Sequence, residues 1–199
     1  MDNSKKIILH LCATHGSDTL PYREAGYDVR IIGEDIGVEN YTPPDNVYGI
    51  IANPPCTHFS IARTNAKTSR NLEKGMSLVK ECLRIIWECQ YKIKEGKRNS
   101  PLNFWAIENP ATGMLKYFLG KPVFQYSPHE YGANYTKRTA LWGWFNLPIR
   151  PLLISKLPPC RSIKEMINPI KMDRNFKETM QLRSDCYYSF AQAFFNANR

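Results

Sequence analysis

Short hydrophobic runs recur along the chain at intervals that predict strands separated by helices. Residues 7–12, 27–32, 48–52 and 104–107 are mostly apolar, with His10, Asp28 and Arg30 as the ionisable exceptions, and each segment has the length of a buried strand. A further strand is expected at 139–145. Buried strands that alternate with helices favour a mostly parallel sheet with helices on both faces, an α/β fold.

Four segments carry helical spacing. Apolar residues between 72 and 93 fall three, four or seven positions apart with charges between them, which indicates a long amphipathic helix. Shorter helices are expected at 18–25, where Gly26 follows as a stop signal, and at 112–119. The closing segment, residues 186–198, returns to helical spacing.

The length of 199 residues predicts a single domain over residues 1–199, and five prolines predict an irregular lobe at 148–185. No run approaches the roughly 18 consecutive apolar residues that a membrane-spanning helix needs, so no membrane partner is expected. The first residues lack the pattern of a secretory signal, and the six cysteines lack zinc spacing. We therefore expect reduced thiols, no metal and a cytoplasmic location.

Positive charge is concentrated in the later part of the chain. Lys and Arg number 27 against 18 Asp and Glu, a formal net charge of +9. Residues 1–50 hold four basic and eight acidic side chains, so the remaining residues hold 23 and ten. This excess favours a polyanionic partner, nucleic acid before membrane, although a solvated lysine-rich surface gives the same count.

The motif PPCTHFS at residues 54–60 places a thiol, Cys56, directly after a predicted buried strand. Ligand sites of open α/β sheets lie at such carboxyl ends. A partly exposed cysteine beside a basic, acid-free stretch forms the nucleophilic thiolate more readily than a buried one. The tripeptide PPC recurs at 158–160, so a structural cysteine in a turn is the alternative interpretation.

The motif FWAIENP at residues 104–110 places Glu108 at the end of another predicted strand. A carboxyl group there can approach the same crevice as Cys56, although capping of the next helix is the alternative role. A thiolate and a carboxyl group together suit addition to an electron-poor ring. The thiolate adds to a ring carbon while the acid donates to a ring nitrogen.

Two further motifs have binding character. The turn CATHGS at residues 12–17 suits a nucleotide-like cofactor, with Asp35 near the end of the second strand as an acceptor for ribose hydroxyls. Lys137 and Arg138 precede the strand at 139–145 and suit a base carbonyl or a phosphate. A plain turn, a solvated acidic pair and ordinary loop cations are the alternatives.

In this order, the motifs resemble those of the DNA cytosine C5-methyltransferases, especially the short members that phages often encode. PCTHFS resembles the family's PCxxFS catalytic loop, EN its EN pair, and KRT its arginine-bearing segment. The resemblance implies a Rossmann-like fold, S-adenosylmethionine as methyl donor, and catalysis by Cys56, Glu108 and Arg138. Cys56 would attack C6 of cytosine, Glu108 would engage N3, and Arg138 would hold the base.

The resemblance also implies binding roles. The residues implied to contact S-adenosylmethionine are Ala13, Thr14, His15, Gly16, Asp35, Asn53 and Pro54. Those implied to contact nucleic acid are Ser60, Arg63, Lys67, Arg70 and Lys137. A target base in a duplex has to leave the stack before either ring face is accessible.

The sequence leaves more than one substrate and more than one function open. The stretch between Trp142 and the closing helix is too short for the family's usual target-recognition domain. Three substrates remain open: DNA that is read with little specificity or with the help of a protein partner, single-stranded DNA, and a cytosine nucleotide. The expected setting is a bacterial or phage-infected cell. NPP at residues 53–55 also resembles the motif of exocyclic-amino DNA methyltransferases. A catalytically silent DNA-binding or partner protein is the third interpretation, because the turn at 12–17 holds a single glycine.

Overall fold

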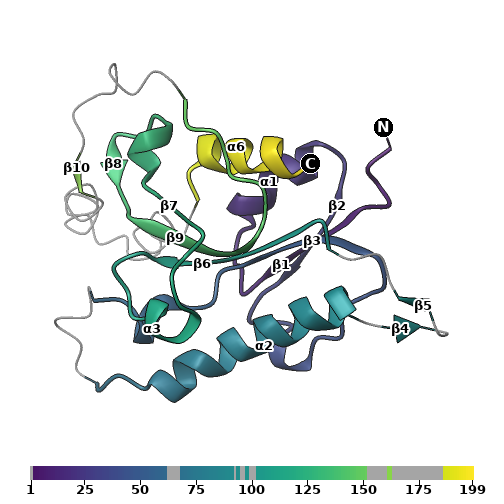
Figure 1. Cartoon of the computed structure of the whole chain (residues 1–199), viewed down its shortest axis with the longest axis horizontal. Helices are drawn as coiled ribbons and strands as arrows, with labels where there is room; N and C mark the ends of the chain where they lie inside the picture. Colours follow the sequence, from purple (N-terminus) through teal and green to yellow (C-terminus); the bar gives the residue numbers. More distant parts are fainter. Residues whose placement is uncertain are drawn as a thin grey trace.

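The computed structural model describes residues 2–61, 68–91, 93–94, 97–98, 102–151, 161–162 and 186–199. Its centre is a six-stranded sheet in the order β2-β1-β3-β6-β9-β7 (Figure 1). The strands are β1 (Ile7–Leu11), β2 (Asp28–Ile32), β3 (Val47–Ala52), β6 (Phe104–Pro110), β7 (Phe124–Tyr126) and β9 (Thr139–Trp144). The first four pair in parallel, whereas β9 runs antiparallel to both its neighbours. The fold is therefore mixed α/β with a mostly parallel sheet, as predicted.

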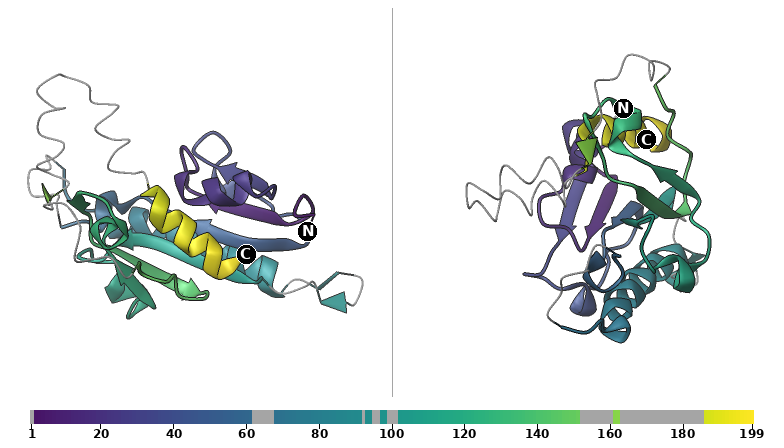
Figure 2. Two further views of the ribbon diagram at one scale, coloured as in Figure 1. Left: turned by 90° about the horizontal axis from the view of Figure 1, so that it is seen from above. Right: turned by 90° about the vertical axis from the view of Figure 1, so that its left-hand side faces the viewer.

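Helices cover both faces of this sheet. α2 (Leu72–Tyr91) and α3 (Lys116–Leu119) lie on one face, and α1 (Leu20–Glu24) and α6 (Tyr188–Asn198) lie on the other (Figures 1 and 2). Short 3-10 helices in the connections are η1 (Ser17–Thr19), η2 (Val38–Asn40), η3 (Cys56–His58) and η4 (Pro128–Tyr131). Two small ribbons pair β4 (Ile93–Lys94) with β5 (Lys97–Arg98) and β8 (Tyr135–Thr136) with β10 (Arg161–Ser162).

Successive side chains of the strands enter two separate hydrophobic clusters. On β3, Ile50 packs in the cluster beneath α2, whereas Ile51 packs in the cluster beneath α1 and α6. This alternation follows from the pleat of a strand, which points neighbouring side chains to opposite faces. Phe104 lies at the centre of the second cluster, with its ring 5.5 Å from that of Tyr22 and 5.6 Å from that of Phe194. The C-terminal helix thus completes the core on that face.

Two predicted helix boundaries are wrong for identifiable reasons. The segment predicted as one helix at 18–25 is split into η1 and α1, because Pro21 has no N–H to continue the bonding from the preceding turn. The helix predicted at 72–93 ends at Tyr91, and Ile93 lies in β4. The residues of the predicted irregular lobe lie outside the described ranges, except 148–151 and 161–162.

The segment after β6 also differs from the prediction. The helix expected at 112–119 is confined to α3, because the Met114 N–H donates to the Phe59 carbonyl oxygen instead of a helical partner. The strand expected at 104–107 continues to Pro110, which pairs with Thr139 of β9. On its other side, β6 pairs with β3 only as far as Ile107. The missing N–H of Pro110 therefore interrupts no hydrogen bonds between β6 and β3.

No helix in the described ranges has the length and apolar character needed to cross a bilayer. The five cysteines in those ranges are all free thiols, at positions 12, 56, 82, 89 and 186.

Gly143 allows β9 to approach β6 closely. Its φ is 149°, and a Cβ at this position would overlap the Trp105 carbonyl oxygen. We predict that Gly143→Ala lowers the free energy of unfolding by about 3 kcal/mol or more, because backbone atoms have to shift. Gly26→Ala is the control: its φ is 82°, but nothing lies within 4 Å, so backbone strain alone costs about 1 kcal/mol. Equal losses in urea unfolding would contradict the steric argument.

Candidate functional site

The strand order places a crevice at the carboxyl ends of β1 and β3. β2 lies on one side of β1, whereas β3 and then β6 lie on the other. Connections leave such a reversal point in opposite directions, and ligands of open α/β sheets bind there. The turn after β1 and the loop after β3 therefore form the two sides of the crevice.

Two neighbouring cavities lie at this edge. The first, the Cys56 cavity, has a volume of about 270 Å³ and is lined by His10, Cys12, Ala13, Thr14, His15, Gly16, Ser17, Asp18, Asn53, Pro54, Pro55, Cys56, Thr57, Glu108, Pro110 and Lys137. The second, the Glu34 cavity, has a volume of about 250 Å³ and is lined by Cys12, Ala13, Thr14, Gly33, Glu34, Gly37, Val38, Glu39, Pro55 and Leu78. Cys12, Ala13, Thr14 and Pro55 line both cavities, so the turn after β1 and Pro55 of the next loop form the wall between them.

Cys56 lies in a loop whose backbone is held by hydrogen bonds. The thiol is half-buried at the first position of η3, after two prolines. The Phe59 and Ser60 N–H groups both donate to the Cys56 carbonyl oxygen, at 2.9 and 2.8 Å. Phe59 is fully buried, and its own carbonyl oxygen accepts the Met114 N–H at 2.9 Å. The backbone that carries the thiol is thus fixed from both the loop and the core.

The end of β6 brings a carboxyl group to the same cavity. Glu108 lines it directly, and the next residue, Asn109, is fully buried. Asn109 Nδ2 donates to the Pro54 carbonyl oxygen at 2.9 Å. This hydrogen bond joins the strand that carries Glu108 to the loop that carries Cys56.

Desolvation changes the acidity of Glu108. Burial raises the pKa of this carboxyl from 4.5 to about 7; Lys137 opposes the shift, and the negative Asp18 adds to it. Around neutral pH a large share of Glu108 is therefore protonated and can donate a hydrogen bond. A carboxyl group in this state is suited to act as a general acid.

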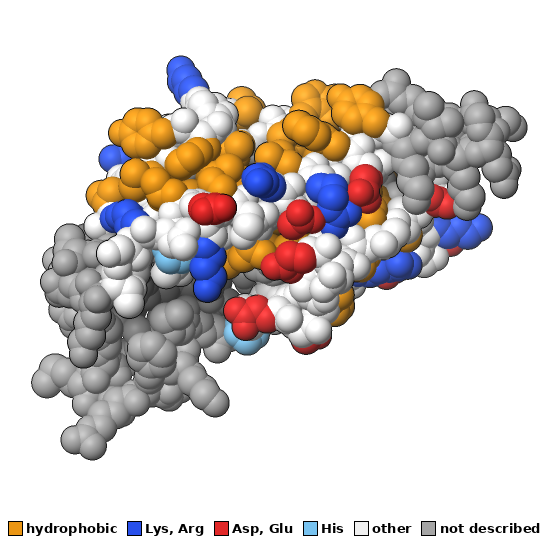
Figure 3. Space-filling model, turned by 90° about the horizontal axis from the view of Figure 1, so that it is seen from below, with side chains coloured by type: hydrophobic (Ala, Val, Ile, Leu, Met, Phe, Trp, Pro, Cys, Tyr) orange, Lys and Arg blue, Asp and Glu red, His pale blue; other side chains and the backbone are white. Residues whose placement is uncertain are grey.

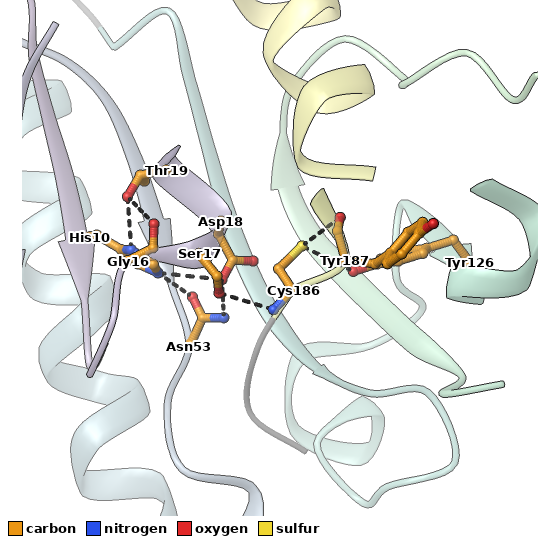
Figure 4. A network of polar contacts seen from close by, with 9 residues as sticks. All are labelled: His10, Gly16, Ser17, Asp18, Thr19, Asn53, Tyr126, Cys186 and Tyr187. Carbon is orange, nitrogen blue, oxygen red and sulfur yellow. Dashed lines mark hydrogen bonds and ion pairs between the residues drawn. The ribbon is translucent and has the colours of Figure 1, made fainter. Parts of the chain in front are cut away.

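A buried polar network underlies the turn and the loop (Figure 4). His10 of β1 is 1% exposed, with Nδ1 3.0 Å from Thr19 Oγ1 and Nε2 3.0 Å from Asn53 Oδ1. Asn53 Nδ2 donates to Asp18 Oδ2 at 3.3 Å, so its Oδ1 accepts from His10 Nε2. Burial lowers the pKa of His10, against the nearby Asp18 carboxylate, which raises it.

The start of the C-terminal segment is bonded to the same turn. The Cys186 N–H donates to Ser17 Oγ at 2.9 Å, and the Ser17 hydroxyl lies 3.4 Å from Asp18 Oδ2 (Figure 4). Cys186 precedes α6, so the helix that completes the core also anchors the turn after β1. Ser17 closes the turn predicted at residues 12–17, but neither Ser17 nor Asp18 was among the residues implied to bind the donor.

Most residues implied to bind the donor line one of the two cavities. Asp35 is the exception, since it is exposed and lines neither, whereas its neighbour Glu34 lines the second cavity. Asn53 lines the Cys56 cavity, but both ends of its amide already bond within the protein. Its role in the network could not be inferred from the sequence.

The residue predicted to hold the base, Arg138, and those predicted to contact nucleic acid differ in whether they reach the Cys56 cavity. Lys137 lines the Cys56 cavity, whereas Arg138 is exposed and lines neither cavity. Arg70 is exposed and donates to the His58 carbonyl oxygen at 3.0 Å, and Ser60 is half-buried and lines neither cavity. Residues 63 and 67, predicted as Arg63 and Lys67 contacts, lie outside the described ranges.

A larger hollow, of about 860 Å³, lies on the outer side of α2. It is lined by Thr42, Lys80, Leu83, Arg84, Trp87, Glu88 and Tyr91. Figure 3 shows the molecule from the α2 side, where hydrophobic side chains gather on part of the surface. The hollow contains none of the residues that the motifs single out, so its size does not make it the candidate site. In the described ranges no group of three or more His, Cys, Asp or Glu side chains is placed to hold a metal ion.

Among known proteins, solved structures show distant likenesses to this chain. No family model matches the sequence, and no curated protein matches it. A solved structure described as a candidate DNA modification methyltransferase encoded within a prophage of E. coli is 15% identical, with a TM-score of 0.48. The similarity covers 82% of this chain and 55% of that one, so this chain spans about half its length.

The raised pKa of Glu108 predicts how stability depends on pH. A folded-state pKa of about 7, above the ordinary 4.5, makes protonation stabilise the fold. This contribution is complete below about pH 4.5 and is lost as the pH rises through 7. We predict that the difference in unfolding free energy between the wild type and Glu108→Gln falls by about 3 kcal/mol across this range.

Urea unfolding at a series of pH values measures that difference. Glu73→Gln, at an exposed residue in the first turn of α2, is the matched control, and it should leave the pH dependence in place. A wild type and a Glu108→Gln variant whose stabilities change in parallel would show that Glu108 has an ordinary acidity.

Proposed function

We propose that this protein is a DNA cytosine C5-methyltransferase that uses S-adenosylmethionine. The observation that supports this most is that Cys56 and Glu108, carried by separate strand ends, line one cavity beside the turn after β1. Addition to a pyrimidine needs a nucleophile at a ring carbon and an acid at the neighbouring nitrogen. The motif order described above supports the same reaction.

The reaction divides between these two side chains. The Cys56 thiolate forms a bond to C6 of cytosine while Glu108 donates its proton to N3, which makes C5 a carbon nucleophile. S-adenosylmethionine, when bound, supplies the methyl group that C5 takes. Water then takes the C5 proton, the electrons of that C–H bond restore the C5–C6 double bond, Cys56 leaves C6 as a thiolate, and Glu108 recovers the N3 proton.

The Glu34 cavity has features that fit the adenosine part of this donor. Glu34 can accept hydrogen bonds from ribose hydroxyls, and Val38 and Leu78 offer apolar surface to the adenine ring. A Cβ at Gly33 would lie 2.8 Å from the Ala13 carbonyl oxygen, so a glycine is needed where this wall passes the turn. The shared wall leads from this cavity to Cys56, where the methyl group would be transferred.

DNA is the proposed substrate because the protein carries a formal charge of +9 and exposes Arg70 and Arg138. Within the Cys56 cavity, Lys137 is the cation placed to contact the base. We therefore assign to Lys137 the base-holding role that the resemblance gave to Arg138, and to Arg138 a contact with phosphate. In both roles the cation pairs with an oxygen of the nucleotide.

Methyl transfer tests the proposed function. Purified protein incubated with labelled S-adenosylmethionine and cytosine-containing DNA should transfer label to C5, and Cys56→Ser should abolish transfer. DNA containing 5-fluorocytosine should leave a covalent adduct on Cys56, because fluorine cannot depart as a proton. Cys89→Ser, at a buried thiol on α2 that lines neither cavity, should retain both results.

Two outcomes would replace the proposal with another function. Label on an exocyclic nitrogen, without the adduct, would favour an amino-methyltransferase. Calorimetry that finds no donor binding, together with salt-dependent DNA binding, would favour a catalytically silent DNA-binding protein.

Neighbouring cations provide a second test. Lys137→Ala should lower kcat/KM about 10- to 100-fold, the usual effect of losing a charged hydrogen bond. It should also move the pH profile upwards, because Lys137 lowers the pKa of Glu108. Arg138→Ala should weaken DNA binding and reduce its salt dependence, with kcat changed less than about threefold. Larger losses of kcat in Arg138→Ala than in Lys137→Ala would reverse the assignment.

A further inference from the structure

Two thiols face each other across the wall of the candidate site. Cys12 lies in the turn after β1 and lines both cavities, whereas Cys82 lies in the middle of α2 and is fully buried. Their sulfur atoms are 3.6 Å apart. The proposed methyl transfer uses neither side chain, so their contact needs its own explanation.

The backbone at Cys12 has an uncommon conformation. Its φ is 55°, in the left-handed region, and Cys12 and Asn46 are the non-glycine residues with a positive φ in the described ranges. A side chain other than glycine, Asn or Asp adopts this region at a cost of about 1–2 kcal/mol. The chain accepts this cost at a residue whose thiol meets the helix beneath the turn. Outliers of this kind are a reason to look for a function.

We propose that Cys12 and Cys82 form an oxidative modification site, at which a peroxide converts the two thiols into a reversible disulfide. A disulfide bond is about 2.05 Å long, so the two sulfur atoms have to approach each other by about 1.5 Å. Hydrogen peroxide is the chemical class of oxidant that we name. It is small enough to reach Cys12 through either cavity.

Oxidation of the two thiols takes two steps. The Cys12 sulfur attacks one peroxide oxygen, the O–O bond breaks, and the products are a Cys12 sulfenic acid and water. The Cys82 sulfur then attacks the Cys12 sulfur, the S–O bond breaks, and the departing hydroxide takes the Cys82 proton to form a second water. The two thiols together lose two electrons and two protons, and the peroxide is reduced to two waters.

Accessibility sets the order of these steps. Cys12 is the thiol that lines the cavities, whereas Cys82 has no exposed surface. The hydrogen bond with Cys12 and burial both raise the pKa of Cys82, which holds it as a thiol in the resting protein. Cys12 therefore reacts first with the oxidant, and Cys82 resolves the product.

The disulfide would change the shape of the site. Cys82 is fixed by its helix and by the buried side chains around it, among them Val79 and Ile86. Cys12 lies in a turn, with its N–H bonded to the Ile32 carbonyl oxygen at 2.9 Å. Closure of the gap therefore moves the turn, and with it the wall between the two cavities. This consequence rests on the proposed function, because it assumes that the donor binds there.

Peptide mapping tests the modification itself. Full-length protein is treated with hydrogen peroxide, its remaining thiols are blocked with N-ethylmaleimide, and the digest is examined by mass spectrometry. We expect a peptide pair linked through Cys12 and Cys82 that dithiothreitol separates. Cys89→Ser, a second buried thiol on α2, should give the same linked pair. Cys82→Ser should instead leave a Cys12 sulfenic acid that dimedone traps.

The cross-link result decides the proposal whether or not the protein is a methyltransferase. Oxidation of Cys12 to sulfinic acid with no link, or a link from Cys12 to another cysteine, would overturn it. If Cys82→Ser unfolds, as circular dichroism would show, Cys82→Ala serves the same purpose.

Calorimetry with S-adenosylmethionine tests the effect on the site. Oxidised wild-type protein should bind the donor at least tenfold more weakly than reduced protein. Cys89→Ser, which keeps both Cys12 and Cys82, should lose affinity to the same extent after peroxide treatment. Equal affinities before and after oxidation would overturn the coupling. Absence of binding by the reduced protein would count against the proposed function and leave the cross-link result unaffected.

Discussion

The candidate site depends on one buried hydrogen bond, from the Asn109 side chain to the Pro54 carbonyl oxygen. β3 and β6 pair with each other up to residues 52 and 107. Beyond that point the two segments separate, and β6 continues beside β9 alone. The bond continues the connection where the pairing stops, directly beside the thiol and the carboxyl. A hydrogen bond of this kind stabilises a fold by about 1 kcal/mol, and its loss leaves a buried amide unsatisfied at a cost of about 1–3 kcal/mol. Its larger effect is to fix the position of Cys56 relative to Glu108.

The same enclosure keeps part of Glu108 protonated near neutral pH. Removal of the carboxyl from water favours its protonated form, and the charges of Lys137 and Asp18 act on it in opposite directions. These effects place the pKa of Glu108 near 7, where a carboxyl group can both donate and accept a proton during one reaction cycle. Glu108 is therefore available as a proton donor because of its position at a cavity wall, and Lys137 limits how far its pKa rises.

That Cys56 and Glu108 line one cavity could be predicted from the sequence, because each lies at the end of a buried hydrophobic run. Parallel strands bring their carboxyl ends to one edge, so residues just after such runs have to lie close together. Roles that depend on the direction of a single loop side chain could not be predicted. Glu34 and Asp35 are neighbours of the same charge, and only the folded loop turns the first of them to the cavity. The bond between Asn109 and Pro54 joins residues distant in sequence and left no local signal.

The turn after β1 holds a single glycine, Gly16, where nucleotide-binding turns are often glycine-rich. Gly16 has a φ of 73°, where a residue with a side chain costs about 1–2 kcal/mol, and a Cβ there would push the end of the Ile31 side chain, 2.7 Å away, so glycine is favoured at this position. Side chains of the network around His10 and Asp18 hold the rest of the turn. Glycine-rich turns expose rows of backbone N–H groups, which suit phosphate oxygens. The donor that we propose is a sulfonium cation without phosphates, so a turn fixed by side chains, with a carboxylate in the cavity wall, is compatible with its charge.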